Sequence, residues 1–226
     1  MTCSRRKFVK GIGTVVIFAG PLSGALANTS AGPGAKPFRY AMIHDESLCN
    51  GCNLCTIGCR NVNRVPPEGA RLSIAHIPTA ETRTEIKYRF FRQSCQHCEH
   101  APCIDVCPTG ASYRDPQNGI VRINTSKCIG CSYCISACPY QVRYLNKTTR
   151  VADKCDFCLE TRLLKGYPPI CVSVCPQKAL IFGREDSPEI QNWLNTHDYY
   201  LYQLEGAGKP QLYRHFGEHV VSKENV

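Results

Sequence analysis

Cysteine spacing constrains this chain more than any other feature of its sequence. Of 17 cysteines in 226 residues, sixteen fall into four groups of four, and each group begins with C-x2-C and ends with x3-C. The groups are Cys49, Cys52, Cys55 and Cys59; Cys95, Cys98, Cys103 and Cys107; Cys128, Cys131, Cys134 and Cys138; and Cys155, Cys158, Cys171 and Cys175. A spacing that recurs in this way indicates an internal repeat. The fold must therefore be organised around these thiols.

The third group has the spacing C-x2-C-x2-C-x3-C-P of bacterial ferredoxins. In that pattern three cysteines hold one [4Fe–4S] cluster and the fourth is a ligand of another. Pro139 biases Cys138 toward an extended backbone, which ends the local turn. Gly51 and Gly130 let loop N–H groups come close to sulfur and form a nest around an anionic cluster. The spacing therefore predicts iron–sulfur clusters.

Disulfides and zinc are the two alternatives. A disulfide framework is typical of small secreted domains and does not require four copies of a ferredoxin spacing. Structural zinc prefers well-separated C-x2-C pairs, whereas groups one and three crowd three cysteines into seven residues. His97 and His100 lie inside group two, but four cysteines already complete that group, so we expect polar roles for both. Lys127 and Lys154 each precede a group and either raise local potentials or are surface lysines.

The N-terminal segment has the features of an export signal. Arg5 and Arg6 precede a mildly apolar stretch that ends in Ala25-Leu26-Ala27, an A-x-A cleavage pattern. We predict a twin-arginine signal peptide over residues 1–27, which implies export of the folded protein to the periplasm. An uncleaved amphipathic anchor is the alternative. Cleavage would remove Cys3 and lower the formal net charge from +9 to +5.

Composition bears on two partner classes. The remaining chain is mildly basic and has no basic run with interleaved aromatic residues, so we predict no nucleic-acid binding. Beyond residue 27 no apolar run approaches membrane length, so any membrane contact is expected through a partner.

The segments between the cysteine groups predict an α+β fold of short strands and turns. Strands are expected at 38–44 and 179–183, a hairpin at 71–77 with 85–92, two strands within 112–124, a helix from 159 to 164, and a strand at 199–204. We divide the chain into a cluster-binding domain over residues 28–182 and a C-terminal extension over residues 183–226.

From Tyr40 to about Gly183 the chain resembles the iron–sulfur subunits of dimethyl-sulfoxide-reductase-type enzymes. Within them, the segments RYAMIHDESLC, ACPYQVR and ADKCDFC are most similar to the NrfC-type proteins of formate-dependent nitrite reduction. The resemblance implies two interleaved bacterial-ferredoxin-like units around four [4Fe–4S] clusters, in which groups one and four enclose groups two and three. One departure is Arg60, which stands where a proline follows the other three groups.

The same resemblance implies which cysteines share a cluster. Set A is Cys49, Cys52, Cys55 and Cys175; set B is Cys59, Cys155, Cys158 and Cys171; set C is Cys95, Cys98, Cys103 and Cys138; set D is Cys107, Cys128, Cys131 and Cys134. With sixteen cysteines for sixteen cluster corners, no iron keeps an open position for a substrate, and we predict no catalytic residues.

The expected function is therefore electron transfer. By resemblance, an integral-membrane quinol-oxidising subunit (NrfD-like) would supply the electrons and a c-type cytochrome of nitrite reduction would accept them. The alternative is the iron–sulfur subunit of a molybdopterin oxidoreductase that acts on tetrathionate, thiosulfate, polysulfide or a sulfoxide.

Overall fold

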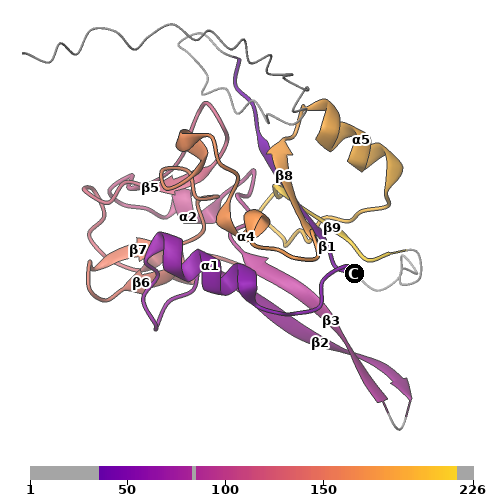
Figure 1. Ribbon diagram of the computed structural model, residues 1–226. Coiled ribbons are helices and arrows are strands. Elements are labelled where there is room, and N and C mark those ends of the chain that lie inside the picture. The colour runs from indigo at the N-terminus through magenta and orange to yellow at the C-terminus, as the bar shows by residue number, and fades with distance from the viewer. Residues whose placement is uncertain (1–35, 83–84, 218–226) are drawn as a thin grey trace, which may run out of the picture.

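The computed structural model describes residues 36–82 and 85–217, so the predicted signal peptide lies outside the described residues. Short strands alternate with short helices (Figure 1), as expected of an α+β fold. The strands are β1 (Tyr40–Asp45), β2 (Leu72–Thr82), β3 (Glu85–Ser94), β4 (Ser112–Arg114), β5 (Val121–Ile123), β6 (Tyr144–Asn146), β7 (Val151–Asp153), β8 (Leu180–Arg184) and β9 (Leu212–His215). The helices are α1 (Leu54–Asn63), α2 (Pro102–Asp105), α3 (Tyr133–Ser136), α4 (Ile170–Ser173), α5 (Pro188–Thr196) and the 3-10 turn η1 (Leu163–Lys165). Among the described residues no helix has the length and apolar character needed to cross a membrane.

A three-stranded sheet joins the two ends of the described chain. Strand β1 is its centre, with β8 antiparallel on one side and β9 parallel on the other. Helix α5 lies against this sheet, where Ile190 packs with Ala41, Ile43 and Tyr213. The part of the chain after residue 183 is thus built into the same core as the first strand.

The predicted strand at 199–204 does not form. Within it only Tyr200 makes an isolated bridge, to Arg214, and the strand of this region is β9. The backbone at 202–204 is held instead by Tyr140, whose hydroxyl donates to the carbonyl of Tyr202 at 3.1 Å and accepts from the N–H of Leu204 at 3.0 Å. A side-chain anchor therefore replaces the ladder that the aromatic pattern predicted.

Three hairpins account for the remaining strands. Strands β2 and β3 pair antiparallel from Leu72 with Ser94 outward, so the predicted hairpin is confirmed and is longer than expected; it projects from the body of the protein (Figure 1). Strands β4 and β5 form the hairpin predicted within 112–124, and β6 pairs with β7.

The short helices bring the cysteine groups together in two pairs. Helix α1 of group one lies against α4 of group four, and α2 of group two lies against α3 of group three. The predicted helix at 159–164 is wrong, because only the turn η1 forms there before Gly166 and two prolines end it. Arg60 follows Cys59 at the position where the other three groups have a proline. Helix α1 therefore continues past Cys59 to Asn63 and is ten residues long.

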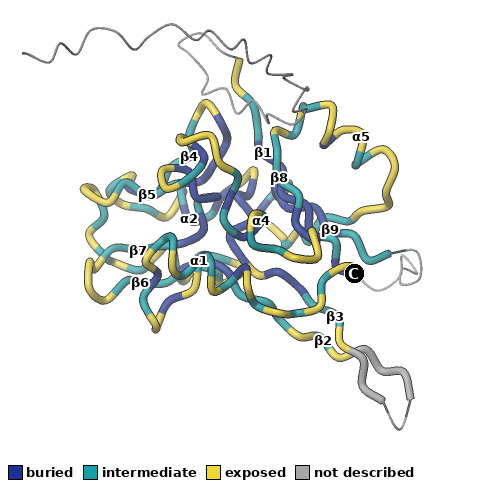
Figure 2. The backbone as a smooth tube through the Cα atoms, viewed as in Figure 1, coloured by how far each residue is buried: buried dark blue, intermediate teal, exposed yellow. Residues whose placement is uncertain are grey.

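The thiols are part of the hydrophobic core. One buried cluster packs Met42, Phe157 and Leu212 with cysteines of groups one, two and four. A second packs Val121 and Ala152 with cysteines of groups two and three. Figure 2 shows buried residues gathered towards the middle of the molecule, with exposed residues around them.

Candidate metal centres

One backbone feature recurs in all four cysteine loops. The residue immediately before the second cysteine has a positive φ in each: Gly51 at 71°, His97 at 49°, Gly130 at 72° and Phe157 at 56°. A residue in the left-handed backbone conformation turns the neighbouring N–H groups of the loop inward, and these groups form a nest that can bind an anion. The sequence indicated this at the two glycines only. At His97 and Phe157 a Cβ makes the conformation cost about 1–2 kcal/mol, and both side chains are buried, so packing offsets the cost.

The cysteines of set C surround one small cavity and those of set D surround another. Cys95, Cys98, Cys103 and Cys138 line the first together with Tyr140 and Val142. Cys107, Cys128, Cys131 and Cys134 line the second together with Ile123 and Ile129. In each cavity three cysteines come from one loop and the fourth from the other loop of the pair. The spaces have mostly apolar walls apart from sulfur.

The thiols of set A and those of set B are also brought together. Burial raises the pKa of Cys49, and the neighbouring thiols of Cys55, Cys175 and Cys52 raise it further. Burial likewise raises the pKa of Cys59, with Cys155, Cys158 and Cys171 adding to the effect. The four thiols of each set therefore lie close enough together for the negative charge of one to oppose ionisation of the next.

These four sets fit iron–sulfur clusters in donor type, number and setting. All the cysteines in the described part of the chain are free thiols. Thiolate sulfur is the ligand that such clusters require, four to each cluster. Within residues 36–82 and 85–217, no three His, Cys, Asp or Glu side chains converge closely enough to hold a single metal ion.

Comparison with known proteins places the chain in a family. The ferredoxin-like protein YdhX of Escherichia coli K12 is 68% identical over 226 residues, which is all of both chains. NrfC of the same strain is 50% identical over 216 residues, 95% of this chain and 96% of NrfC. The thiosulfate reductase electron transfer subunit PhsB of Salmonella typhi is 51% identical over 177 residues, 78% of this chain and 92% of PhsB. The family of 4Fe-4S dicluster domains matches this chain over residues 86–185. The chain belongs to this ferredoxin-like iron–sulfur family.

Exposure of the thiols differs between the four sets of this iron–sulfur protein. Every cysteine of set B is buried, and three of the four in set C are buried. Set A contains the exposed Cys52 and set D the exposed Cys131. Two sets therefore reach the surface and two are enclosed.

His97 is a structural residue rather than a ligand. It is fully buried, and its Nδ1 accepts a hydrogen bond from the N–H of Val121 at 3.1 Å. Burial lowers the pKa of His97 well below its ordinary value, and the positive charge of Lys154 lowers it further. The imidazole is therefore neutral and carries its proton on Nε2. His100, in contrast, is exposed.

The two lysines that precede cysteine groups occupy different environments. Lys127 is exposed and suits the surface interpretation. Lys154 is buried, and its ammonium group donates to the carbonyl oxygens of Cys155, at 2.8 Å, and Val121. Only Lys154 is placed to act on a neighbouring redox centre.

Asn63 is a site residue that the sequence analysis missed. Its amide nitrogen lies 3.6 Å from the sulfur of Cys59 and 3.3 Å from the sulfur of Cys158, both in set B. Its amide oxygen accepts from the hydroxyl of Thr161 at 3.0 Å, which fixes the direction of the amide. Because Arg60 lets α1 continue, the absence of a proline at that position was the available signal.

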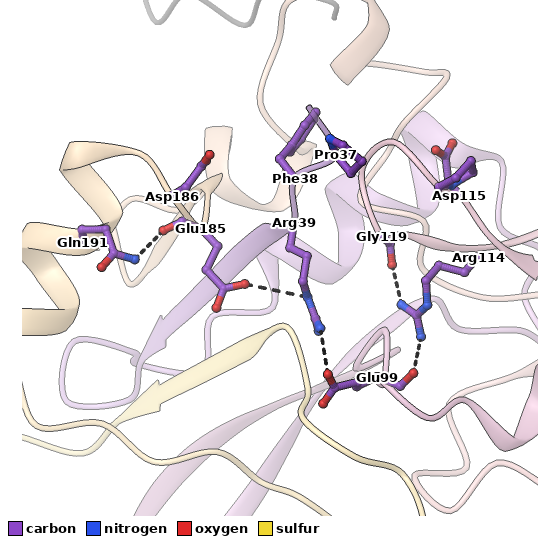
Figure 3. A pocket seen from close by; sticks show the side chains of 11 residues that line it. Pro37, Phe38, Arg39, Glu99, Arg114, Asp115, Gly119, Glu185, Asp186 and Gln191 are labelled. Atoms are coloured by element: carbon purple, nitrogen blue, oxygen red, sulfur yellow. Dashed lines mark hydrogen bonds and ion pairs between the residues drawn. The ribbon is translucent and has the colours of Figure 1, made fainter. Parts of the chain in front are cut away.

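A surface groove of about 650 Å³ lies near the start of β1, and Glu99 of the second cysteine loop forms part of its wall (Figure 3). Its charged side chains neutralise one another: Arg39 lies 3.9 Å from Glu99 and 3.8 Å from Glu185. Arg114 donates to the carbonyl of Gly119 at 2.8 Å. These contacts hold together the surface where the C-terminal part of the chain meets β1.

Proposed function

We propose that this protein carries single electrons along four [4Fe–4S] clusters, from a quinol-oxidising membrane protein to a c-type cytochrome of nitrite reduction. The observation that carries the proposal is the pattern of exposure, with two enclosed sets of cysteines and two that reach the surface. An electron carrier needs an entry, an exit and protected centres between them. Its centres need no open coordination position.

The proposed ligands are the four sets of cysteines that the resemblance to iron–sulfur subunits implies. Support comes from the two cavities lined by sets C and D and from the mutual effects of the thiols within sets A and B. When bound, each cluster supplies a one-electron redox couple, whose potential depends on burial, hydrogen bonds to sulfur and net charge. The protein supplies thiolates, inward-facing N–H groups and a dry interior.

The contacts between loops support the order A, B, C, D. Arg92 interacts with Cys55 of set A and with Cys171 of set B. The rings of His97 and Phe157, which precede Cys98 and Cys158, pack against each other at a tilt of 34° between sets C and B. The exposed sets A and D then stand at the two ends of the row.

Exposed apolar side chains at both ends support contact with redox partners. Leu54 and Ile57 of α1 are 43% and 53% exposed beside set A. Ile129 and Tyr133 are 68% and 61% exposed beside set D. Exposed apolar groups of this kind are typical of protein interfaces. The twin-arginine pattern and A-x-A site support a periplasmic location, peripheral to the inner membrane.

A second candidate is the iron–sulfur subunit of a molybdopterin reductase for thiosulfate, tetrathionate, polysulfide or a sulfoxide. The observation that favours it is the 51% identity to PhsB. The cluster sets would be the same, and only the electron acceptor would differ.

One purification tests both candidates. The complex is purified from the membranes of anaerobically grown cells by an affinity tag on this protein. Iron, molybdenum and covalent haem are then assayed in the same sample. We expect about sixteen iron atoms per chain with c-type haem and no molybdenum. Stoichiometric molybdenum would favour the reductase candidate. Iron and labile sulfide near zero in anaerobically purified protein would contradict the electron-carrier function itself.

A further inference from the structure

Two arginines are buried among the cysteine sets without a carboxylate partner. Arg92, on β3, is 1% exposed, and Arg143, just after group three, is 5% exposed. Among the described residues neither forms an ion pair with Asp or Glu, although other buried arginines such as Arg214 do. Burying an uncompensated charge is strongly unfavourable. A negative group must therefore face each of them.

Each guanidinium group has at least one nitrogen atom that lacks a hydrogen-bond partner among the described residues. Arg92 donates from Nη1 to the hydroxyl of Ser94, while its Nε and Nη2 have no partner in the described part of the chain. Arg143 donates from Nη2 to the hydroxyl of Ser112 at 2.9 Å, and its Nη1 has no partner there. Buried N–H groups are almost always satisfied, so these donors point to an acceptor beside them.

The surroundings of Arg92 are thiols of two different sets. Burial alone would lower the pKa of Arg92, but attraction to the negative forms of Cys171, Cys155 and Cys55 outweighs it and raises the pKa. Cys55 belongs to set A, and the other two belong to set B. Arg92 therefore faces both.

Arg143 has the equivalent position in the other half of the protein, where it lines the cavity that the cysteines of set C surround. Burial again opposes the charge, and the thiols Cys103, Cys95 and Cys134 raise the pKa of Arg143. Two of these belong to set C and Cys134 belongs to set D. Each pair of neighbouring sets thus contains one buried guanidinium group.

We propose that Arg92 is shared by the clusters of sets A and B, and Arg143 by the clusters of sets C and D, as fixed cations that raise the reduction potential of both members of each pair. Reduction adds negative charge to a cluster, so a buried cation nearby favours the reduced state. A cation that faces two clusters also offsets their mutual repulsion. The inference rests on the proposed ligand sets.

The test compares Arg92→Gln, Arg143→Gln and the double variant by EPR-monitored redox titration of the full-length protein in its purified complex. Arg92→Gln is expected to shift the midpoint potentials of two clusters downward and leave the other two in place. Arg143→Gln is expected to shift the complementary two, and the double variant all four. Arg184→Gln is the matched control, because Arg184 is exposed and its ion pair with Asp186 lies at the surface.

Lysine variants separate charge from folding. Arg92→Lys and Arg143→Lys keep the positive charge and are expected to keep potentials close to those of the unsubstituted protein. If the glutamine variants lose iron while the lysine variants retain it, a buried cation is needed for the clusters to assemble, which supports the same role. Unchanged potentials in both glutamine variants, or a shift of all four clusters in each, would overturn the inference. Absence of iron in the unsubstituted protein would instead overturn the proposed function.

Discussion

The imidazole ring of His97 lies against the phenyl ring of Phe157, with ring centroids 4.1 Å apart. One residue comes from group two and the other from group four, and each immediately precedes the second cysteine of its group. Both have a left-handed backbone conformation. This ring contact therefore fixes two cysteine loops at once and joins the halves of the protein at sets B and C.

Substitution of Phe157 tests the structural importance of this contact. Phe157 is 1% exposed, so Phe157→Ala removes a fully buried ring and leaves a cavity. We expect a loss of about 3–5 kcal/mol in the free energy of unfolding, measured anaerobically by guanidinium denaturation with far-UV circular dichroism. Tyr133→Ala, at a 61% exposed ring, is the control and should change it by no more than about 0.5 kcal/mol. A similar denaturation midpoint for both variants would contradict the structural role of this ring contact.

Buried neutral histidines should make the protein less stable in mild acid. Burial lowers the pKa of His44 to about 3, and Arg92 and Arg214 contribute to the decrease. Since the folded-state pKa lies below that of the unfolded chain, stability is present above about pH 6.5 and is lost as the pH falls below it. Between about pH 7.5 and about pH 5.5 we expect His44 to account for a loss of about 1.4 kcal/mol.

The matched variants for this pH dependence are His44→Gln and His100→Gln. Unfolding free energies measured at both pH values should show a shallower dependence for His44→Gln, because that variant removes the titrating group. His100 is exposed, and its substitution should leave the dependence unchanged. Equal slopes in all three proteins would show that His44 is not the responsible group.

Asn63 should raise the potential of one cluster. Its amide faces the sulfurs of Cys59 and Cys158, and hydrogen bonds to sulfur stabilise the reduced state. Asn63→Leu is expected to lower a single midpoint potential in an EPR titration, whereas the exposed Asn192→Leu should lower none. A shift spread over several clusters would argue against a local hydrogen bond.

The buried pair Glu46 and Arg214 anchors the C-terminal part of the chain. The side chain of Glu46 has no exposed surface, and Arg89 lies 3.3 Å from the same carboxylate. Glu46→Gln leaves two arginines without their counter-charge, so we expect a loss of about 3–5 kcal/mol in the free energy of unfolding. Asp186→Asn breaks a pair whose carboxylate is 61% exposed and should cost at most about 1 kcal/mol. Thermal unfolding of both variants is measured under argon. An equal loss of stability in the two would contradict the role of burial at Glu46.

Local spacing was sufficient to predict much of the cysteine chemistry and the hairpins. Three cysteines within seven residues constrain one another directly, and the DPQNG segment between two apolar strands predicts its own turn. The same reasoning failed at 159–164, where the helical pattern gave only the turn η1, and at 199–204, where the hydroxyl of Tyr140 holds the backbone in place of a strand ladder.

The sequence by itself determined the donor atoms, their division into four groups and the loops that carry them, because these depend on residues close together in the chain. Only the tertiary structure decided which thiols are enclosed, that Arg92 and Arg143 each face two sets, and that Asn63 reaches the sulfur of Cys158. These relationships join residues far apart in the sequence. They follow from the packing of α1 on α4 and of α2 on α3, and no local pattern encodes that packing.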